Sequence, residues 1–215
     1  MCRDRASVSE RARSTRPTET RLKKIGIYGG SFDPIHHGHL ILAREALETL
    51  DLAEVIFVLA AQSPHKALAG PRSAAARWEM LTAAIAGESY FSASRLEIDR
   101  PPPSYTIETV ERLRAENSDA KFFFLVGQDN LKALPSWHRF AELSQLFQFV
   151  VLDRSGEPLD ERYPIVRRRI DISATTIRNR VASGQTIRYL VPEAVEQIIY
   201  REKLYQESNQ SNPKS

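Results

Sequence analysis

The residues best suited to chemistry lie in one short segment, residues 29–40, which reads GGSFDPIHHGHL. Its first two residues, Gly29 and Gly30, allow the backbone to turn sharply and to approach a ligand closely. His36 and His39 are three positions apart, so both side chains can face one ligand if a helix begins there. A helix start offers free backbone N–H groups and the positive end of a dipole, which favour phosphate. The segment therefore predicts a phosphate-binding loop with two imidazole groups beside it.

Other kinds of site would use similar residues. A dinucleotide fingerprint requires G-x-G-x-x-G and an acid after the second strand, whereas Gly26, Gly29 and Gly30 have other offsets and the sequence there reads LAAQ. A Walker A loop requires a glycine followed by lysine, which these glycines are not. A metal site would use the three clustered histidines, but no Asp, Glu or Cys follows at a supporting spacing. Histidines that only cap and pack are the last alternative, which suits a single histidine better than two flanking a glycine.

A second segment, residues 172–178 with the sequence ISATTIR, also has a phosphate-binding pattern. Ser173 has the position of an N-cap, and Thr175 and Thr176 fall in the first helical turn after it. Arg178 lies five residues past the cap and could hold a phosphate by two hydrogen bonds. Alone, the pattern also suits a well-capped surface helix with an exposed arginine. Paired with the first segment, it indicates a second helix start for phosphate.

Further candidates follow the other predicted strands. Lys66, within the sequence PHK, could bind phosphate or could be a solvated loop lysine. Gly127 allows a ligand to come close to the backbone. Asp129 could accept hydrogen bonds from ribose hydroxyl groups, as acids at this place in such sheets do, or could cap a helix.

Apolar runs and helical spacings alternate along the chain and predict the elements that position these residues. Strands are expected at residues 25–28, 55–61, 121–126 and 148–152, with extended segments at 91–98. Helices are expected at residues 38–50, 72–86, 104–115 (capped by Ser104), after 173, and at 192–205. The alternation predicts an α/β, Rossmann-like, doubly wound and mainly parallel sheet with a small C-terminal helical subdomain. In such sheets ligands bind at the carboxyl ends of the strands, near the switch in strand order.

The net charge of +3 is concentrated at the N-terminus. The first 24 residues carry eight Lys and Arg against three Asp and Glu, which leaves −2 for the other 191. The pI of about 9.1 therefore reports a tail, not a basic face for nucleic acid. Residues 1–22 and 206–215 are expected to be disordered tails around a domain at 23–205. An organelle transit peptide is the alternative for the first tail, although its three acids are unusual for one.

Composition excludes several classes of protein. The only cysteine is Cys2, so neither a disulfide framework nor a Cys-based zinc site is expected. The longest apolar run, residues 55–61, is too short to span a membrane, and the first residues lack the apolar core of a signal peptide. We expect a soluble cytoplasmic protein that binds neither a membrane nor nucleic acid. The sequence leaves the oligomeric state open.

The two motifs together carry a resemblance to a known family. Residues 29–40 resemble the (H/T)-x-G-H signature of the nucleotidylyltransferase superfamily, and residues 172–178 resemble its I-S-x-T-x-I-R motif. From Lys24 to Tyr205 the sequence is similar to the bacterial nicotinate-nucleotide adenylyltransferases. The resemblance implies an enzyme of NAD biosynthesis that transfers the adenylyl group of ATP to nicotinate mononucleotide, with Mg²⁺ bound through the ATP phosphates. The alternatives are a nicotinamide-nucleotide or pantetheine-phosphate adenylyltransferase, and a nucleotide-binding sensor without catalysis.

The resemblance also implies roles for individual residues. His36, His39 and Arg178 would be catalytic, the histidines donating hydrogen bonds to the bridging and β-phosphate oxygens. Ser31 and Phe32 would offer backbone N–H groups to the α-phosphate. The ATP-binding set would be Gly29, Gly30, Ser31, Phe32, His36, His39, Lys66, Gly127, Asp129, Ser173, Thr175, Thr176 and Arg178. Ser63 stands where the family pattern P-P-H-K has its first proline.

The remaining set implied by the resemblance binds the mononucleotide. Trp137 matches an aromatic residue that stacks on the pyridine ring in the family, although a core tryptophan is the alternative. Lys66 belongs to the same set, and Tyr105 and Thr106 are added to it from the residues themselves. If Ser104 caps a helix, the backbone N–H groups around Tyr105 and Thr106 attract an anion. The sequence therefore predicts a preference for the acid form of the substrate over the amide.

Overall fold

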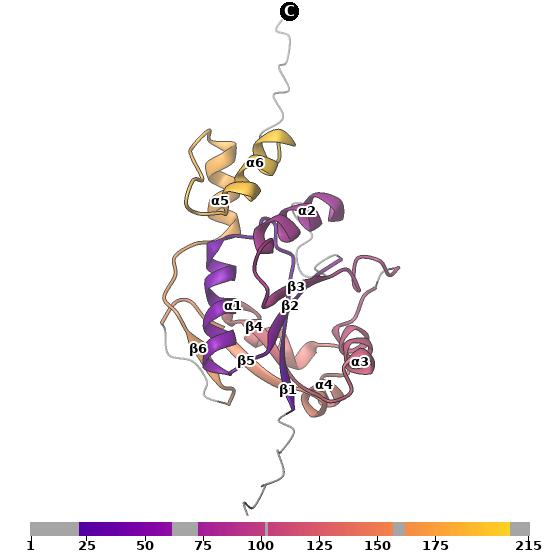
Figure 1. The fold of residues 1–215 in the computed structure, drawn as a ribbon. Coiled ribbons are helices and arrows are strands. Elements are labelled where there is room, and N and C mark those ends of the chain that lie inside the picture. The colour runs from indigo at the N-terminus through magenta and orange to yellow at the C-terminus, as the bar shows by residue number, and fades with distance from the viewer. Residues whose placement is uncertain (1–21, 62–72, 102, 157–161, 207–215) are drawn as a thin grey trace, which may run out of the picture.

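The computed structural model describes residues 22–61, 73–101, 103–156 and 162–206. Within them, six strands form one parallel sheet in the order β3-β2-β1-β4-β5-β6 (Figure 1). The strands are β1 (Lys23–Gly30), β2 (Glu54–Leu59), β3 (Phe91–Ser94), β4 (Ala120–Gly127), β5 (Gln148–Asp153) and β6 (Ile165–Arg167). The helices are α1 (His37–Thr49), α2 (Ala74–Ile85), α3 (Thr106–Glu116), the 3₁₀ helix η1 (Gln128–Ser136), α4 (Phe140–Leu146), α5 (Ala174–Ala182) and α6 (Glu193–Arg201).

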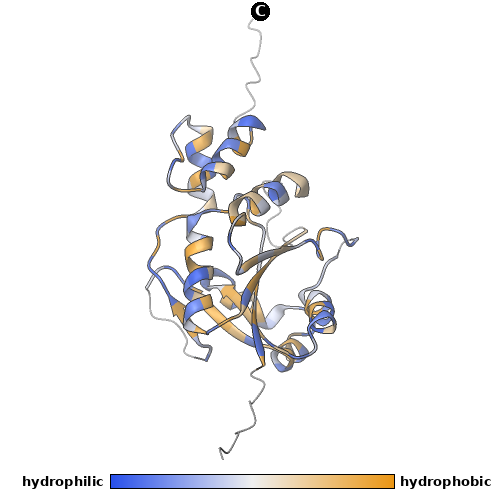
Figure 2. Ribbon diagram, in the orientation of Figure 1, coloured by the Kyte–Doolittle hydropathy of each residue, from blue (hydrophilic) through white to orange (hydrophobic). Residues whose placement is uncertain are grey.

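The sheet is covered on both faces, which is why its strands read as apolar runs. One core lies between the sheet and α1, α2, α5 and α6, and it contains Leu42, Leu81, Ile177 and Ile199. The other lies against α3, η1 and α4 and contains Ile107, Leu134 and Leu143. Figure 2 shows the central strands among the most hydrophobic parts of the chain. The doubly wound α/β fold predicted from the sequence is the one observed.

The order of the strands places the candidate site. From β1 the chain moves outward through β2 and β3, whereas from β4 it moves the other way through β5 and β6. The switch in direction therefore falls between β1 and β4, which are neighbours in the sheet. The carboxyl ends of these two strands carry the 29–40 segment and the residues from Gly127 onward, so both predicted groups meet at one crevice.

Several predicted boundaries were wrong. The extended segment predicted at residues 91–98 is a strand only as far as Ser94. η1, α4 and β6 were not predicted: α4 and β6 have only seven and three residues, and η1 is a 3₁₀ helix that contains Pro135. Ser104 is not the cap of α3: Tyr105 is the N-cap and uses no side-chain hydrogen bond. The Oγ atom of Ser104 instead accepts a hydrogen bond from Nη2 of Arg100 at 2.9 Å.

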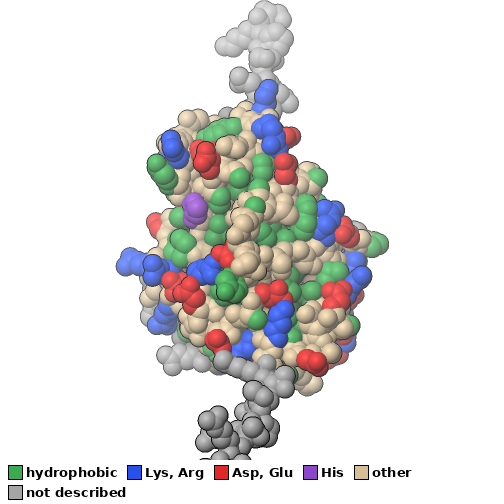
Figure 3. Space-filling view, in the orientation of Figure 1, with side chains coloured by type: hydrophobic (Ala, Val, Ile, Leu, Met, Phe, Trp, Pro, Cys, Tyr) green, Lys and Arg blue, Asp and Glu red, His purple; other side chains and the backbone are tan. Residues whose placement is uncertain are grey.

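The surface carries charges of both signs. On the face drawn in Figure 3, Lys and Arg are interspersed with Asp and Glu among the described residues. This mixture agrees with the near balance of charge outside the first 24 residues. No helix in the described ranges is long and apolar enough to cross a membrane.

Candidate active site

Two adjoining cavities lie at the carboxyl ends of β1 and β4. The histidine cavity encloses about 210 Å³, and its lining includes His36, His39, Ser173 and Arg178. The tryptophan cavity encloses about 510 Å³, and its lining includes Trp137. Both are lined by Gly29, Gly30, Ser31 and Asn130. A ligand in one cavity would therefore meet a ligand in the other at the turn that follows β1.

The two histidines of the first motif lie face to face but differ in environment. Their rings stack with centroids 3.7 Å apart. The backbone N–H of His36 donates to Nδ1 of His39 at 3.3 Å, so the neutral His39 ring carries its hydrogen on Nε2 and can donate it to a ligand. Burial, helped by the charges of His39, Arg154 and His37, lowers the pKa of His36 to about 2. His36 is therefore neutral at working pH.

The tight packing of this loop explains two of its glycines. A Cβ atom on Gly38 would lie 2.9 Å from Nδ1 of His36, so only glycine leaves room for that ring. A Cβ atom on Gly30 would lie 2.8 Å from the ring of Phe32, which folds back under the turn with φ of 43°. Nδ1 of His36 is buried without a hydrogen-bond partner among the described residues. Buried polar atoms left in this way are a feature of functional sites.

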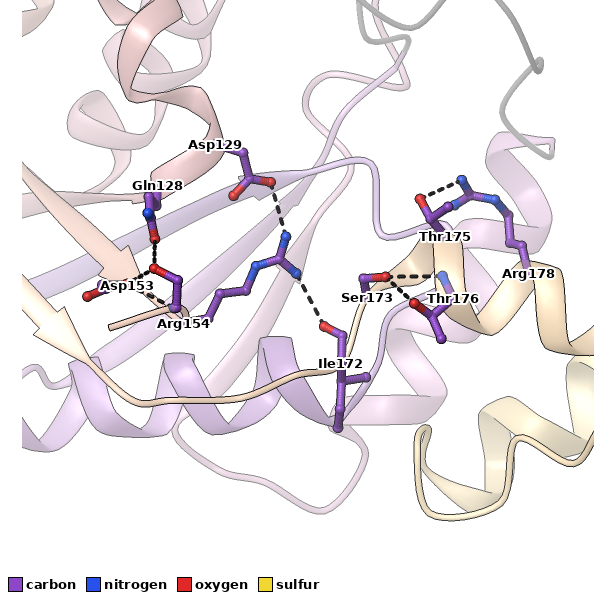
Figure 4. A network of polar contacts seen from close by, with 10 residues as sticks. Gln128, Asp129, Asp153, Arg154, Ile172, Ser173, Thr175, Thr176 and Arg178 are labelled. Carbon is purple, nitrogen blue, oxygen red and sulfur yellow. Dashed lines mark hydrogen bonds and ion pairs between the residues drawn. The ribbon is translucent and has the colours of Figure 1, made fainter. Parts of the chain in front are cut away.

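The second motif forms the far wall of the histidine cavity (Figure 4). Oγ of Ser173 accepts a hydrogen bond from the backbone N–H of Thr176 at 3.0 Å, so Ser173 caps α5 as predicted. Arg178 donates from Nη1 to the carbonyl oxygen of Asp33 at 2.8 Å and from Nη2 to Oγ1 of Thr175 at 3.2 Å. A guanidinium has five N–H groups, so Arg178 can tie the two motifs together and still donate to a phosphate.

Arg154 is a site residue that the sequence analysis missed. It follows β5, and its side chain lies between Asp129 and Ile172, as Figure 4 shows. Its Nη1 donates to the carbonyl oxygen of Ile172 at 3.2 Å, and its Nη2 donates to Oδ2 of Asp129 at 3.5 Å. It places a cation in the histidine cavity. Its position directly after a predicted strand was the signal that could have found it.

Arg77 is a second residue that was missed, and it supports the site from behind. It belongs to α2 and is only 1% exposed. Its Nη1 donates to the carbonyl oxygens of Ser31 and Ala60, each at 2.8 Å, and its Nη2 donates to that of Ala61 at 3.1 Å. A buried arginine within a helical pattern gives no sequence signal of what it contacts. Its effect is to join the turn after β1 to the end of β2.

The tryptophan cavity is more apolar in character and includes the start of α3. Tyr105 and Thr106 line it, together with Trp137 and His138. The rings of Tyr105 and His138 stack with centroids 4.2 Å apart. Trp137 packs edge-on against Phe124 of β4, with ring centroids 5.6 Å apart, and it also lines the cavity. Trp137 therefore packs on the core and also lines the cavity.

The structure brings most of the predicted site residues together. Those that line the histidine cavity are Gly29, Gly30, Ser31, Phe32, His36, His39, Gly127, Asp129, Ser173, Thr175 and Arg178. Tyr105, Thr106 and Trp137 line the tryptophan cavity. Thr176 lines neither, and its side chain bonds with Oγ of Ser173 at 2.8 Å. Lys66 lies outside the described residues.

A family model described as cytidylyltransferase-like matches residues 27–180, which include both motifs. The chain belongs to this family. A protein of Geobacillus thermodenitrificans (strain NG80-2), named "Probable nicotinate-nucleotide adenylyltransferase", is 42% identical over 187 residues, covering 86% of this chain and 87% of that protein. A Shouchella clausii (strain KSM-K16) protein with the same name is 42% identical over 194 residues, or 88% and 100% of the two chains. These findings confirm the resemblance, and with it that this cytidylyltransferase-like protein is a nucleotidyltransferase.

Solved structures show the same fold at lower sequence identity. The nicotinic acid mononucleotide adenylyltransferase of Plasmodium falciparum, in complex with NaAD, has a TM-score of 0.71 and is 21% identical, covering 85% of this chain and 97% of that one. Its complex with APC gives a TM-score of 0.69 at 20% identity over the same shares. At these identities the likeness confirms the Rossmann-like architecture of the cytidylyltransferase-like protein.

Proposed function

We propose that this protein transfers the adenylyl group of ATP to the 5′-phosphate of nicotinate mononucleotide, giving deamido-NAD and pyrophosphate. One observation carries the proposal: a cavity of phosphate-binding character and a cavity lined by aromatic residues share the turn Gly29–Ser31. ATP would fill the first and the pyridine nucleotide the second, so that the acceptor phosphate reaches the α-phosphorus at the turn. The names of the relatives at 42% identity support the same substrate pair.

The chemistry needs positioning and charge neutralisation more than covalent catalysis. An oxygen of the acceptor phosphate forms a bond to the α-phosphorus of ATP, and the bond from that phosphorus to the bridging oxygen breaks. Negative charge then grows on the departing pyrophosphate. His39, Arg178 and Arg154 line the histidine cavity, where the Nε2–H group of His39 and the two guanidinium groups would stabilise that charge.

The start of α3 supports a preference for the acid form of the mononucleotide. Tyr105, its N-cap, makes no side-chain capping bond, so the first backbone N–H groups of the helix are not satisfied by their own cap. This helix start lines the tryptophan cavity. An anion placed there gains roughly 0.3–1 kcal/mol from the helix dipole, in addition to its hydrogen bonds. The amide would present an NH₂ group to donors and leave polar groups unpaired.

Magnesium would accompany ATP in this proposal. Within the described residues no three His, Cys, Asp or Glu side chains are grouped so that they could hold a metal ion. Asp33 and Asp129 line the histidine cavity and could add oxygen ligands to those of the phosphates, which suits the preference of Mg²⁺ for oxygen. When bound, the ion would neutralise part of the phosphate charge.

We further propose that the enzyme is cytoplasmic and that its catalytic domain spans residues 23–205.

A pyrophosphate-release assay tests the proposal. The full chain is given ATP with nicotinate mononucleotide, nicotinamide mononucleotide or 4′-phosphopantetheine, and the nucleotide product is identified by mass. We expect release with the nicotinate compound at a kcat/KM at least tenfold above that with the amide. Equal values, or a preference for the amide, would move the protein to the nicotinamide-nucleotide enzymes. Release with none of the three would reject an adenylyltransferase of this kind.

A further inference from the structure

The tryptophan cavity contains a carboxyl group that the proposed reaction does not use. Glu97, in the segment after β3, lines this cavity beside Ser104, Tyr105 and Thr106 at the start of α3. Its side chain is partly buried, and its Oε1 accepts a hydrogen bond from Oγ1 of Thr109 at 3.5 Å. Thr109 is itself only 2% exposed, so the Glu97 carboxyl group lies against a buried part of α3. The proposed function places the carboxylate of the pyridine ring in the same cavity.

The cation that lowers the pKa of Glu97, Arg100, is also paired with a second acid, Glu108. Arg100, three residues later, donates from Nη1 to Oε2 of Glu108 at 3.0 Å and from Nη2 to the hydroxyl groups of Ser104 and Thr109. The ion pair of Arg100 is made with Glu108, and Arg100 acts on Glu97 through its charge. The other titratable side chains that line the cavity are Tyr105 and His138. From the end of β2, the backbone of Ala61 also interacts with Glu97.

Burial outweighs these favourable contacts. It raises the pKa of Glu97 to about 7, against the lowering effects of Arg100, Thr109 and the Ala61 backbone. The protonated and ionised forms are thus both accessible near neutral pH. A second carboxylate brought into the cavity would disfavour the ionised form further, because two like charges in a partly buried site repel each other.

Building on the proposed function, we propose that Glu97 is a specificity-determining residue: its carboxyl group is protonated when the acid-form mononucleotide is bound, and it is free to be ionised when the amide form is bound. When Glu97 is protonated, it does not repel the ring carboxylate, and its O–H group can donate a hydrogen bond to that carboxylate. Ionised Glu97 repels that carboxylate, whereas it can accept a hydrogen bond from the NH₂ group of the amide. Discrimination between the two substrates then depends on pH, and binding of the acid form takes up a proton from the solvent.

The kinetic test compares wild type with Glu97→Gln from pH 6 to pH 9. The ratio of kcat/KM for the two mononucleotides cancels ionisations that affect both substrates equally and reports groups of the free enzyme. We expect the wild-type preference for the acid form to fall by up to about tenfold per pH unit above neutrality, and to stay constant in Glu97→Gln. Glu116→Gln, an identical change in charge at the other end of α3, should follow wild type. A wild-type ratio that does not vary with pH, or the same decline in Glu97→Gln, would overturn the role of Glu97.

Calorimetry on the wild-type protein tests the same idea without a variant. Binding of each mononucleotide is measured at pH 8 in two buffers of different ionisation enthalpy, which gives the number of protons taken up. We expect the acid form to take up about one proton more than the amide form. Equal uptake would reject the inference. The proposed function fails separately, if neither mononucleotide supports pyrophosphate release or if the amide is preferred at every pH.

Discussion

At the scale of single residues, the two histidines of the first motif differ in burial and in hydrogen bonding. His36 is 3% exposed and neutral, and it packs against Gly38. His39 is less buried, and the backbone of His36 fixes which of its nitrogens carries the hydrogen. One residue therefore shapes the site, while the other is the better placed to donate to a phosphate oxygen.

The first prediction concerns His39. We expect His39→Ala to lose about 10²–10³ in kcat while ATP still binds, because its Nε2–H group acts on charge that appears only in the transition state. His37→Ala is the matched control, since His37 lines neither cavity and should retain wild-type kinetics. Steady-state kinetics together with an ATP-binding titration decide the matter. A higher KM for ATP at unchanged kcat would contradict the assigned role.

The buried state of His36 predicts how stability responds to acid. Its folded pKa of about 2 lies below the ordinary value of 6.5. The contribution of His36 to the unfolding free energy is therefore complete above pH 6.5. It is lost as the pH falls, because the unfolded chain then binds a proton that the folded protein does not. Between pH 7.5 and pH 5.5 this residue should contribute a loss of about 1 kcal/mol.

Urea unfolding of wild type, His36→Gln and His37→Gln at the two pH values checks this. The decrease in unfolding free energy should be smaller in His36→Gln than in the other two proteins, whatever its stability at pH 7.5. The same decrease in all three would show that His36 is protonated in the folded state.

At the scale of elements, the turn after β1 is held by side chains from three distant helices or their ends. Arg77 of α2 binds the carbonyl oxygen of Ser31, and Arg178 of α5 binds that of Asp33. The hydroxyl of Tyr205, just past α6, donates to Oδ1 of Asp33 at 2.5 Å. The turn that both cavities share therefore owes its shape to contacts made across up to 172 positions of the chain.

This arrangement predicts that Tyr205 positions the turn. Tyr205→Phe keeps the buried ring but removes the hydrogen bond to a carboxylate, which is worth about 1.5–3 kcal/mol. We expect a lower Tm and a kcat/KM for ATP reduced by about tenfold, since misplacement of a phosphate-binding turn affects the rate directly. Tyr200→Phe, on the more exposed side of α6 (41% exposed), is the control and should match wild type. A lower Tm with unchanged kinetics would leave Tyr205 a purely stabilising residue.

At the scale of the whole molecule, the C-terminal helices complete a site that begins at the first strand. α5 and α6 stand beyond the carboxyl ends of the strands (Figure 1), and their buried residues belong to the same core as α1 and α2. The second motif is therefore fixed by packing, not only by its own sequence. By contrast, residues 1–22 carry no apolar pattern that could pack on this core.

Deletion of residues 1–22 should consequently leave catalysis intact, since β1 begins at Lys23. We expect kcat/KM within about twofold of wild type and a Tm within a few degrees, because surface changes away from the core are usually small. Both are measured at two salt concentrations, because the deletion removes an excess of positive charge. A loss of activity or of soluble protein would show that this segment contributes to the domain.

The sequence by itself determined the α/β architecture, the two motifs and the helix starts that follow them. These features depend on local pattern: apolar runs, glycine pairs and capping residues act over a few positions. For the same reason Gly29, His39 and Ser173 could be singled out with no knowledge of the fold. The elements η1, α4 and β6 could not be predicted, because α4 and β6 are too short to show a periodic pattern and Pro135 interrupts the helical pattern of η1.

Only the tertiary structure decided which side chains complete the site and what state they are in. Arg77 and Arg154 have no motif, and each acquires its role from carbonyl groups far along the chain. Ser104 was predicted to cap α3, but its hydroxyl group instead accepts a hydrogen bond from Arg100. His36 and Glu97 have ordinary pKa values in an unfolded chain, and burial moves one to about 2 and the other to about 7. Desolvation depends on what surrounds a group in three dimensions, and no spacing of letters contains that information.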